Sequence, residues 1–216
     1  MQGLTRPNLE TARSWYAPED DIHGFEHVKR VYHLCEKIGA AEGADMEILL
    51  TAALLHDSRG SAPDGSERPN HHMKSAEFAE QILQELGWPA ERIQAVQHCI
   101  RAHRFRQNGE APTSLEAKIL FDADKLDVIG AIGAARTLGY AIKAGKPFFS
   151  EPSAQFMATG QKESDEIYSA YHEYLFKLRK ISEVLFTNTA RRLAVERQVF
   201  LNSFFEELAA EYRGVK

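Results

Sequence analysis

The sequence predicts an all-α protein, a helical bundle in a single domain spanning residues 1–216. Apolar residues recur at three- and four-residue spacings through most of the chain, which is the period of an amphipathic helix. No segment alternates apolar and polar residues over a length that would make a strand. Glycine, proline and serine gather between the periodic segments and mark loops.

The first two predicted helices are the best defined. One spans residues 23–42, and Gly43 ends it; its apolar stripe comprises Val28, Val31, Leu34, Cys35 and Ile38. The next begins after Asp45, a residue suited to N-capping, and runs to residue 57. Because this second segment is apolar on most sides, it is predicted to be a buried central helix.

Five more helices complete the expected bundle. They cover residues 71–86, residues 90–103, a segment from Thr113 or Ser114 to about residue 135, residues 163–185 and residues 189–213. Residues 58–70 and 144–160 are rich in glycine and proline and are predicted loops. Small residues over 130–135 indicate close packing of a helix.

Composition excludes several classes of protein. The chain is 44% hydrophobic and 26% charged, with a formal net charge of −5, whereas a dedicated nucleic-acid-binding domain is normally basic. No apolar run reaches the roughly 18 residues that a membrane span needs, and the N-terminus lacks a signal-peptide core. Cys35 and Cys99 are expected in the core. A cytoplasmic protein is therefore predicted.

Polar residues inside apolar helices point to chemistry. Eight of the nine histidines lie between residues 23 and 103. His27, the adjacent pair His56 and Asp57, and Asp124 each stand among apolar neighbours, where a charge needs a partner or a metal ion. Two imidazoles and two carboxylates suit a transition metal or Mg²⁺. Spacing alone does not show that these residues converge.

The motifs that contain these residues resemble a known family. HVKRV at 27–31, LLHD at 54–57 and DADKLD at 122–127, in this order, resemble the HD superfamily of metal-dependent phosphohydrolases, and in particular a bacterial group with DADKLDxIGAIG. The resemblance is strong over about residues 20–140, and helices over about 160–213 are expected to pack on this core. It implies an all-helical HD domain.

The resemblance also implies the site and its chemistry. His27, His56, Asp57 and Asp124 would bind a divalent ion (Mn, Ni, Fe, Mg, Zn or Co), and a second ion would use histidines among His72, His98 and His103. Within the pair His71 and His72, and within the pair His98 and His103, the sequence does not show which residue is the ligand. Water activated by the metal would hydrolyse a nucleotide or another small phosphate ester or anhydride. Asp57 would orient or deprotonate this water, and Lys125 and Arg104 would balance phosphate charge.

Other interpretations remain open from the sequence. A di-iron oxygenase of HD type, or a non-catalytic regulatory module that binds metal, would use the same ligands. The chain could be a monomer or a homodimer. Within the DADKLD motif, Asp122 is expected to be solvated, and Asp127 either orients a ligand or pairs with Lys125 or Arg136.

Overall fold

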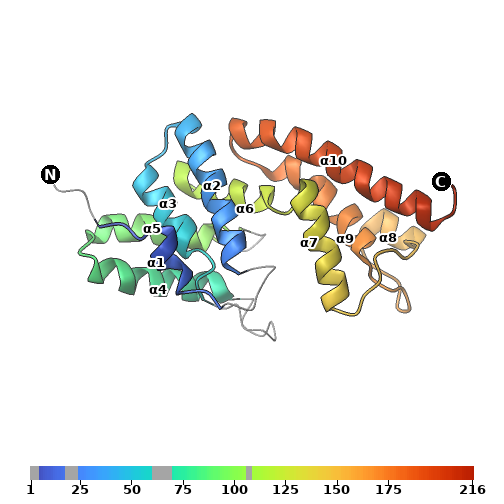
Figure 1. Cartoon of the computed structure of the whole chain (residues 1–216), viewed down its shortest axis with the longest axis horizontal. Coiled ribbons are helices and arrows are strands. Elements are labelled where there is room, and N and C mark those ends of the chain that lie inside the picture. Colours follow the sequence, from blue (N-terminus) through green and yellow to red (C-terminus); the bar gives the residue numbers. More distant parts are fainter. Residues whose placement is uncertain (1–4, 18–23, 60–69, 106–108) are drawn as a thin grey trace. The chain divides into compact units, whose positions relative to one another are not determined.

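The computed structural model describes residues 5–17, 24–59, 70–105 and 109–216 (Figure 1). Every regular element in these ranges is a helix, which confirms the predicted all-α fold. None of the described helices has the length and apolar composition that a membrane span requires. In chain order the elements are α1 (Leu9–Arg13), α2 (Phe25–Glu42), α3 (Met46–Leu55), α4 (His71–Glu85), α5 (Ala90–Ala102), α6 (Leu115–Leu126), α7 (Gly130–Lys143), α8 (Ala154–Thr159), α9 (Ala170–Phe176), the 3-10 helix η2 (Leu178–Val184) and α10 (Asn188–Tyr212).

The first of two compact units comprises Met1–Asp124 and Phe186–Ala190. Within it α2 packs against α3, α3 against α5, and α4 against α5, and the last two run side by side in Figure 1. The predicted apolar stripe of α2 is buried throughout. The start of this predicted helix at residue 23 and most of the predicted loop 58–70 lie outside the described residues.

Helix α3 is the central helix of this unit. Its residues from Leu49 to Leu55 are all buried, which confirms the prediction. The side chain of Asp45 accepts hydrogen bonds from two backbone N–H groups of the first turn, so this residue is the N-cap. Because apolar neighbours surround α3, His56 and Asp57 emerge from its C-terminal end inside the unit.

The predicted single helix from residue 113 or 114 to about 135 is wrong. Helix α6 ends at Leu126, and α7 begins at Gly130, which has a φ of 75°, in the left-handed region that glycine adopts readily. At Gly133 a Cβ atom would lie 2.2 Å from the carbonyl oxygen of Val128. The break between the two helices is therefore residues 127–129, and the small residues at the start of α7 let its first turn lie close to the Val128 carbonyl.

The second compact unit comprises Lys125–Leu185 and Arg191–Lys216. In it α7 packs against α9, which is followed by η2. The predicted helix over 163–185 is wrong, because regular helix begins only at Ala170 and gives way to a 3-10 helix after Phe176. The predicted loop over 144–160 contains the short helix α8. A single domain over 1–216 stays a prediction.

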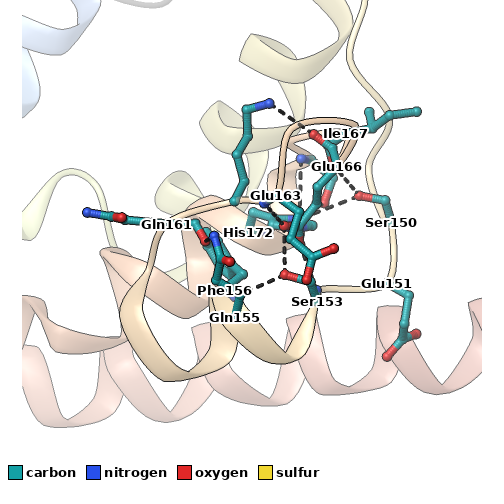
Figure 2. Close-up of polar contacts among 12 residues, drawn as sticks. Ser150, Glu151, Ser153, Gln155, Phe156, Gln161, Glu163, Glu166, Ile167 and His172 are labelled. Carbon is teal, nitrogen blue, oxygen red and sulfur yellow. Dashed lines mark hydrogen bonds and ion pairs between the residues drawn. The ribbon is translucent and has the colours of Figure 1, made fainter.

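Glu166 organises the segment between α8 and α9 (Figure 2). Its carboxylate accepts hydrogen bonds from the backbone N–H groups of Ser153 and Glu163, the Ser153 hydroxyl and His172 Nε2. The Ser169 hydroxyl donates to His172 Nδ1 at 2.8 Å. Ser169 is 1% exposed and His172 is fully buried. This serine–histidine–glutamate series therefore belongs to the core, because its hydroxyl is closed to a substrate.

Candidate metal centre

Three helices of the first unit contribute polar side chains to one buried region. His27 lies in the first turn of α2, His56 is the C-cap residue of α3 with Asp57 directly after it, and Asp124 lies near the end of α6. The two histidines are almost fully buried, and the side chains of Asp57 and Asp124 are 17% and 18% exposed. Charged groups at such depth need an opposite charge or a metal ion.

The ligand atoms of these four residues converge. His27 Nε2 lies 3.4 Å from His56 Nε2 and 3.3 Å from Asp124 Oδ1, and Asp57 Oδ2 lies 3.8 Å from each of the two imidazole nitrogens. One ligand atom from each of His27, His56 and Asp124 falls within 4.8 Å of the other two. The structure thus brings together the four residues predicted to bind the first ion, and their role as ligands stays a prediction.

His56 is held in the form that a metal ion needs. Its Nδ1 donates to the carbonyl oxygen of Ala53 at 2.8 Å, so the lone pair of Nε2 is directed into the group. Burial lowers the pKa of His56 to about 4, although the charge of Asp57 opposes this shift. The imidazole is therefore neutral at pH 7, which is the state that binds a metal ion.

A second group shares Asp57. Its other oxygen, Oδ1, lies 3.1 Å from His71 Nε2 and 3.4 Å from His103 Nε2. The Nδ1 atom of His103 donates to the Ile100 carbonyl oxygen at 2.5 Å, and Arg104 donates to His71 Nδ1 at 3.0 Å. The Asp57 carboxylate therefore links the two groups, with one oxygen facing each.

The surroundings of Asp57 fit a cation. Burial by itself would raise the pKa of Asp57, but the imidazoles of His56, His103 and His71 hold it well below its ordinary value. Its Oδ1 atom is buried and faces the Nε2 atoms of His71 and His103. The nitrogens of His27 and His56 also face each other across 3.4 Å. A divalent ion supplies the positive charge that such a set of electron-pair donors needs.

The structure places the neighbours His71 and His72 differently, and the sequence left open which of them is a ligand. His71 enters the second group, whereas His72, predicted as a ligand of the second ion, enters neither group. The Nδ1 atom of His72 is buried without a hydrogen-bond partner among the described residues, and burial lowers its pKa to about 4. Consecutive helix residues point about 100° apart, so only one of them faces Asp57.

His98 also lies outside both groups. Its Nδ1 contacts a carboxylate oxygen of Glu110 at 2.5 Å, and its Nε2 accepts hydrogen bonds from the backbone and hydroxyl of Thr113. Both ring nitrogens thus hold the segment that precedes α6, and the described structure does not support His98 as a ligand. The remaining predicted histidine, His103, is in the second group.

Arg104 and Lys125, the two side chains predicted to balance phosphate charge, have different surroundings. Arg104 directs its guanidinium group to His71, beside the second group. Lys125 follows Asp124 in α6 but is assigned to the second compact unit. The functional roles of Arg104 and Lys125 both stay predictions.

The three aspartates of the DADKLD motif have three different surroundings. Asp124 joins the first group. Asp122, expected to be solvated, is fully buried and accepts hydrogen bonds from the backbone N–H groups and a hydroxyl of residues 186–187, so that expectation is wrong. Asp127 pairs with Arg136, which is one of the two partners predicted for it.

Comparison with known proteins places these residues within a protein family. The family model of the HD domain matches residues 24–129. The uncharacterised protein YpgQ of Bacillus subtilis (strain 168) is 32% identical over 213 residues, which are 95% of this chain and 94% of that protein. The crystal structure of Bacillus subtilis YpgQ in complex with ADP has a TM-score of 0.73 at 30% identity and covers 97% of this chain and 100% of its own. A predicted HD superfamily hydrolase from an uncultured Thermotogales bacterium has a TM-score of 0.62 at 28% identity, covering 94% of this chain and 90% of its own.

Proposed function

The chain belongs to the HD-domain family, and from this premise we propose that it is a metal-dependent phosphohydrolase. The observation that carries the proposal is the convergence of His27, His56, Asp57 and Asp124 in one buried group. All four residues lie within the segment that matches the HD-domain model. The similarity to a protein described as an HD superfamily hydrolase supports hydrolysis as the class of reaction.

These four residues would hold a divalent ion. Their mixed nitrogen and oxygen donors suit Mn, Fe, Co, Ni or Zn better than they suit Mg, which prefers oxygen ligands alone. When bound, such an ion makes water acidic enough to supply hydroxide near neutral pH and withdraws charge from phosphoryl oxygens. A second ion would use Asp57, His71 and His103, so we propose one or two ions per chain. For His71 Nε2 to bind this ion, Arg104 would withdraw from Nδ1 so that the ring hydrogen can move there.

The residues of the chain itself would prepare the reactants. Asp57 is ionised and faces the first group with one oxygen and two imidazoles with the other, so it would orient the attacking water or deprotonate it. The Ile100 carbonyl fixes the ring of His103 against this carboxylate. The guanidinium group of Arg104, next to His71, and the ammonium group of Lys125 would bind phosphoryl oxygens.

We propose a nucleotide as the substrate class, or another small phosphate ester or anhydride. The relative YpgQ, which is similar to this chain over almost its full length, has been crystallised in complex with ADP. That complex supports a nucleoside phosphate as the first ligand to test. A di-iron oxygenase would need both ion sites, and the similarity to HD-superfamily hydrolases favours hydrolysis over oxygenation.

Elemental analysis of protein purified without chelator tests the metal centre. We expect one or two equivalents of a transition metal, lost in the variants His56→Ala, Asp57→Ala and Asp124→Ala. Matched controls are His33→Ala and Asp165→Asn, because both residues are exposed and belong to neither group. These controls should retain the metal content of the wild type.

Activity is then measured with the metal-loaded protein and a panel of nucleoside mono-, di- and triphosphates. Release of phosphate or pyrophosphate that disappears in the three site variants supports the proposal. Full metal content without hydrolysis of any phosphorylated compound would instead identify a regulatory module. An iron absorbance band with oxygen consumption would identify an oxygenase, and a protein that takes up no metal even after soaking in Mn²⁺, Ni²⁺ or Fe²⁺ contradicts the whole proposal.

A further inference from the structure

The C-terminal end of α3 is closed by side-chain donors. The last carbonyl groups of any helix have no partner within the helix. Here the carbonyl of Ala53 accepts a hydrogen bond from His56 Nδ1 at 2.8 Å, and the carbonyl of Leu55 accepts one from the hydroxyl of Ser58. The carbonyl of Leu54, between them, accepts from the hydroxyl of Tyr16 at 2.7 Å, a residue 38 positions earlier in the chain.

The Tyr16 hydroxyl lies beside the His56–Asp57 pair. It donates its hydrogen to the carbonyl of Leu54, and the charge of Asp57 is close enough to act on the phenol. The hydroxyl is therefore tied to the last turn of α3, directly before the pair. Burial, and then the charge of Asp57, raise the pKa of Tyr16 well above its usual value, so the group keeps its hydrogen. The ring is 7% exposed and packs on Phe25, the first residue of α2.

The neighbouring residue Trp15 holds the other side of the same turn. Its carbonyl oxygen lies 3.5 Å from a guanidinium nitrogen of Arg59, two residues after Asp57. The Arg59 guanidinium group stacks 3.4 Å from the centre of the Phe78 ring, which Trp15 meets edge-on. Residues 15 and 16 thus contact the segment 54–59 both before and after the His56–Asp57 pair.

From these contacts, and resting on the proposed function, we infer that Tyr16 is a positioning residue for the metal centre: its hydroxyl fixes the turn that directs His56 and Asp57 toward the ion. Tyr16 lies outside residues 24–129, so this support comes from the N-terminal segment and not from the part that matches the HD-domain model. Without the hydroxyl, the Leu54 carbonyl loses a buried partner, and the end of α3 that leads into His56 and Asp57 can relax.

The variant Tyr16→Phe tests this inference, since it removes the hydroxyl and keeps the ring. Tyr32→Phe is the matched control, because Tyr32 is a similarly buried tyrosine of α2 and its charged neighbours, such as Arg6 and Glu36, are not residues of the metal centre. Affinity for Zn²⁺ and Mn²⁺ is measured by competition with a chromogenic chelator, together with the thermal midpoint of the metal-free proteins. We expect Tyr16→Phe to bind metal about 10-fold more weakly, as for other groups that orient metal ligands, and Tyr32→Phe to bind as the wild type.

A second measurement does not depend on metal. The imidazole ¹⁵N chemical shifts of His56 in metal-free protein should change in Tyr16→Phe and not in Tyr32→Phe. If Tyr16→Phe changes neither the metal affinity nor the His56 spectrum, the inference is overturned. It is also overturned if both variants lose the same amount of metal affinity and that loss parallels the fall in their thermal midpoints. If the wild type binds no metal, the proposed function fails, and the positioning role in catalysis fails with it even if the His56 signals shift.

Discussion

Substitution of Asp122 by asparagine should separate stability from metal binding within one motif. The carboxylate of Asp122 is fully buried; Oδ1 accepts from the Phe186 N–H at 2.8 Å, and Oδ2 accepts from the N–H and hydroxyl of Thr187 at 2.7 Å each. Asparagine has the same shape but only one acceptor oxygen. Its NH₂ group must therefore face at least one donor.

The expected loss follows from these three hydrogen bonds. If the amide oxygen keeps both contacts with Thr187, the NH₂ group faces the N–H of Phe186, and a buried donor without an acceptor costs about 1–3 kcal/mol. The two remaining bonds lose a charged acceptor, which is stronger than a neutral one by about 1 kcal/mol each. Because the Phe186 N–H is only partly buried, we expect Asp122→Asn to lower the free energy of unfolding by about 3 kcal/mol.

Urea denaturation of the metal-free protein measures this loss, and elemental analysis under native conditions measures metal content. Asp122→Asn should keep the metal content of the wild type. Asp124→Asn, the same chemical change two residues on, should lose the metal. The exposed control Asp165→Asn should change neither quantity. An unfolding free energy for Asp122→Asn within about 0.5 kcal/mol of the wild type, as for a surface substitution, would refute the reasoning.

Three more predictions concern protonation and backbone space. In metal-free protein the folded-state pKa of His56 is about 4 against 6.5 when unfolded, so the unfolded chain binds more protons between these values. The contribution of neutral His56 to the free energy of unfolding is therefore fully present above pH 6.5 and falls by up to roughly 3 kcal/mol toward pH 4. Urea midpoints are measured across this pH range for the wild type and for His56→Asn. The same pH dependence in both proteins would contradict the prediction. Hydrogen bonds from Ser153 and His172 outweigh burial and lower the pKa of Glu166 to about 2, so its contribution is present above about pH 4.5 and lost as pH falls to 2. Glu166→Gln should accordingly be less stable than the wild type at neutral pH, with a difference that shrinks on acidification in thermal melts; a constant difference excludes this explanation. Gly133→Ala should lower the thermal midpoint more than Gly39→Ala does. The new Cβ atom meets a backbone carbonyl at Gly133, whereas at Gly39 it meets only the ends of side chains. A larger loss for Gly39→Ala would count against this reasoning.

Much of the fold was predictable because helices repeat every 3.6 residues. The apolar stripe of α2, the buried α3 and the capping role of Asp45 all follow from local pattern. The break at residues 127–129 was not predictable in the same way. Apolar spacing continues across it, and the left-handed φ of Gly130 and the close approach of Gly133 to the Val128 carbonyl become visible only in the structure.

The sequence by itself identified the residues of the candidate metal centre. A histidine–aspartate pair after an apolar helix, and an aspartate within another, are unfavourable in a core unless they act together. This argument identified His27, His56, Asp57 and Asp124 before any contact was known. It does not extend to residues whose burial depends on a distant segment, such as Asp122, whose hydrogen-bond donors come from residues 186–187.

Only the tertiary structure decided which of several similar side chains face Asp57. His71 and His72 differ by about 100° around one helix, and His98 and His103 by about 140°, so the rotation of each helix about its axis selects the member that points inward. Packing against the rest of the unit sets that rotation, and local sequence does not encode it. The bond from Tyr16 to Leu54 shows the same limit, because a contact across 38 residues leaves no trace in either local pattern.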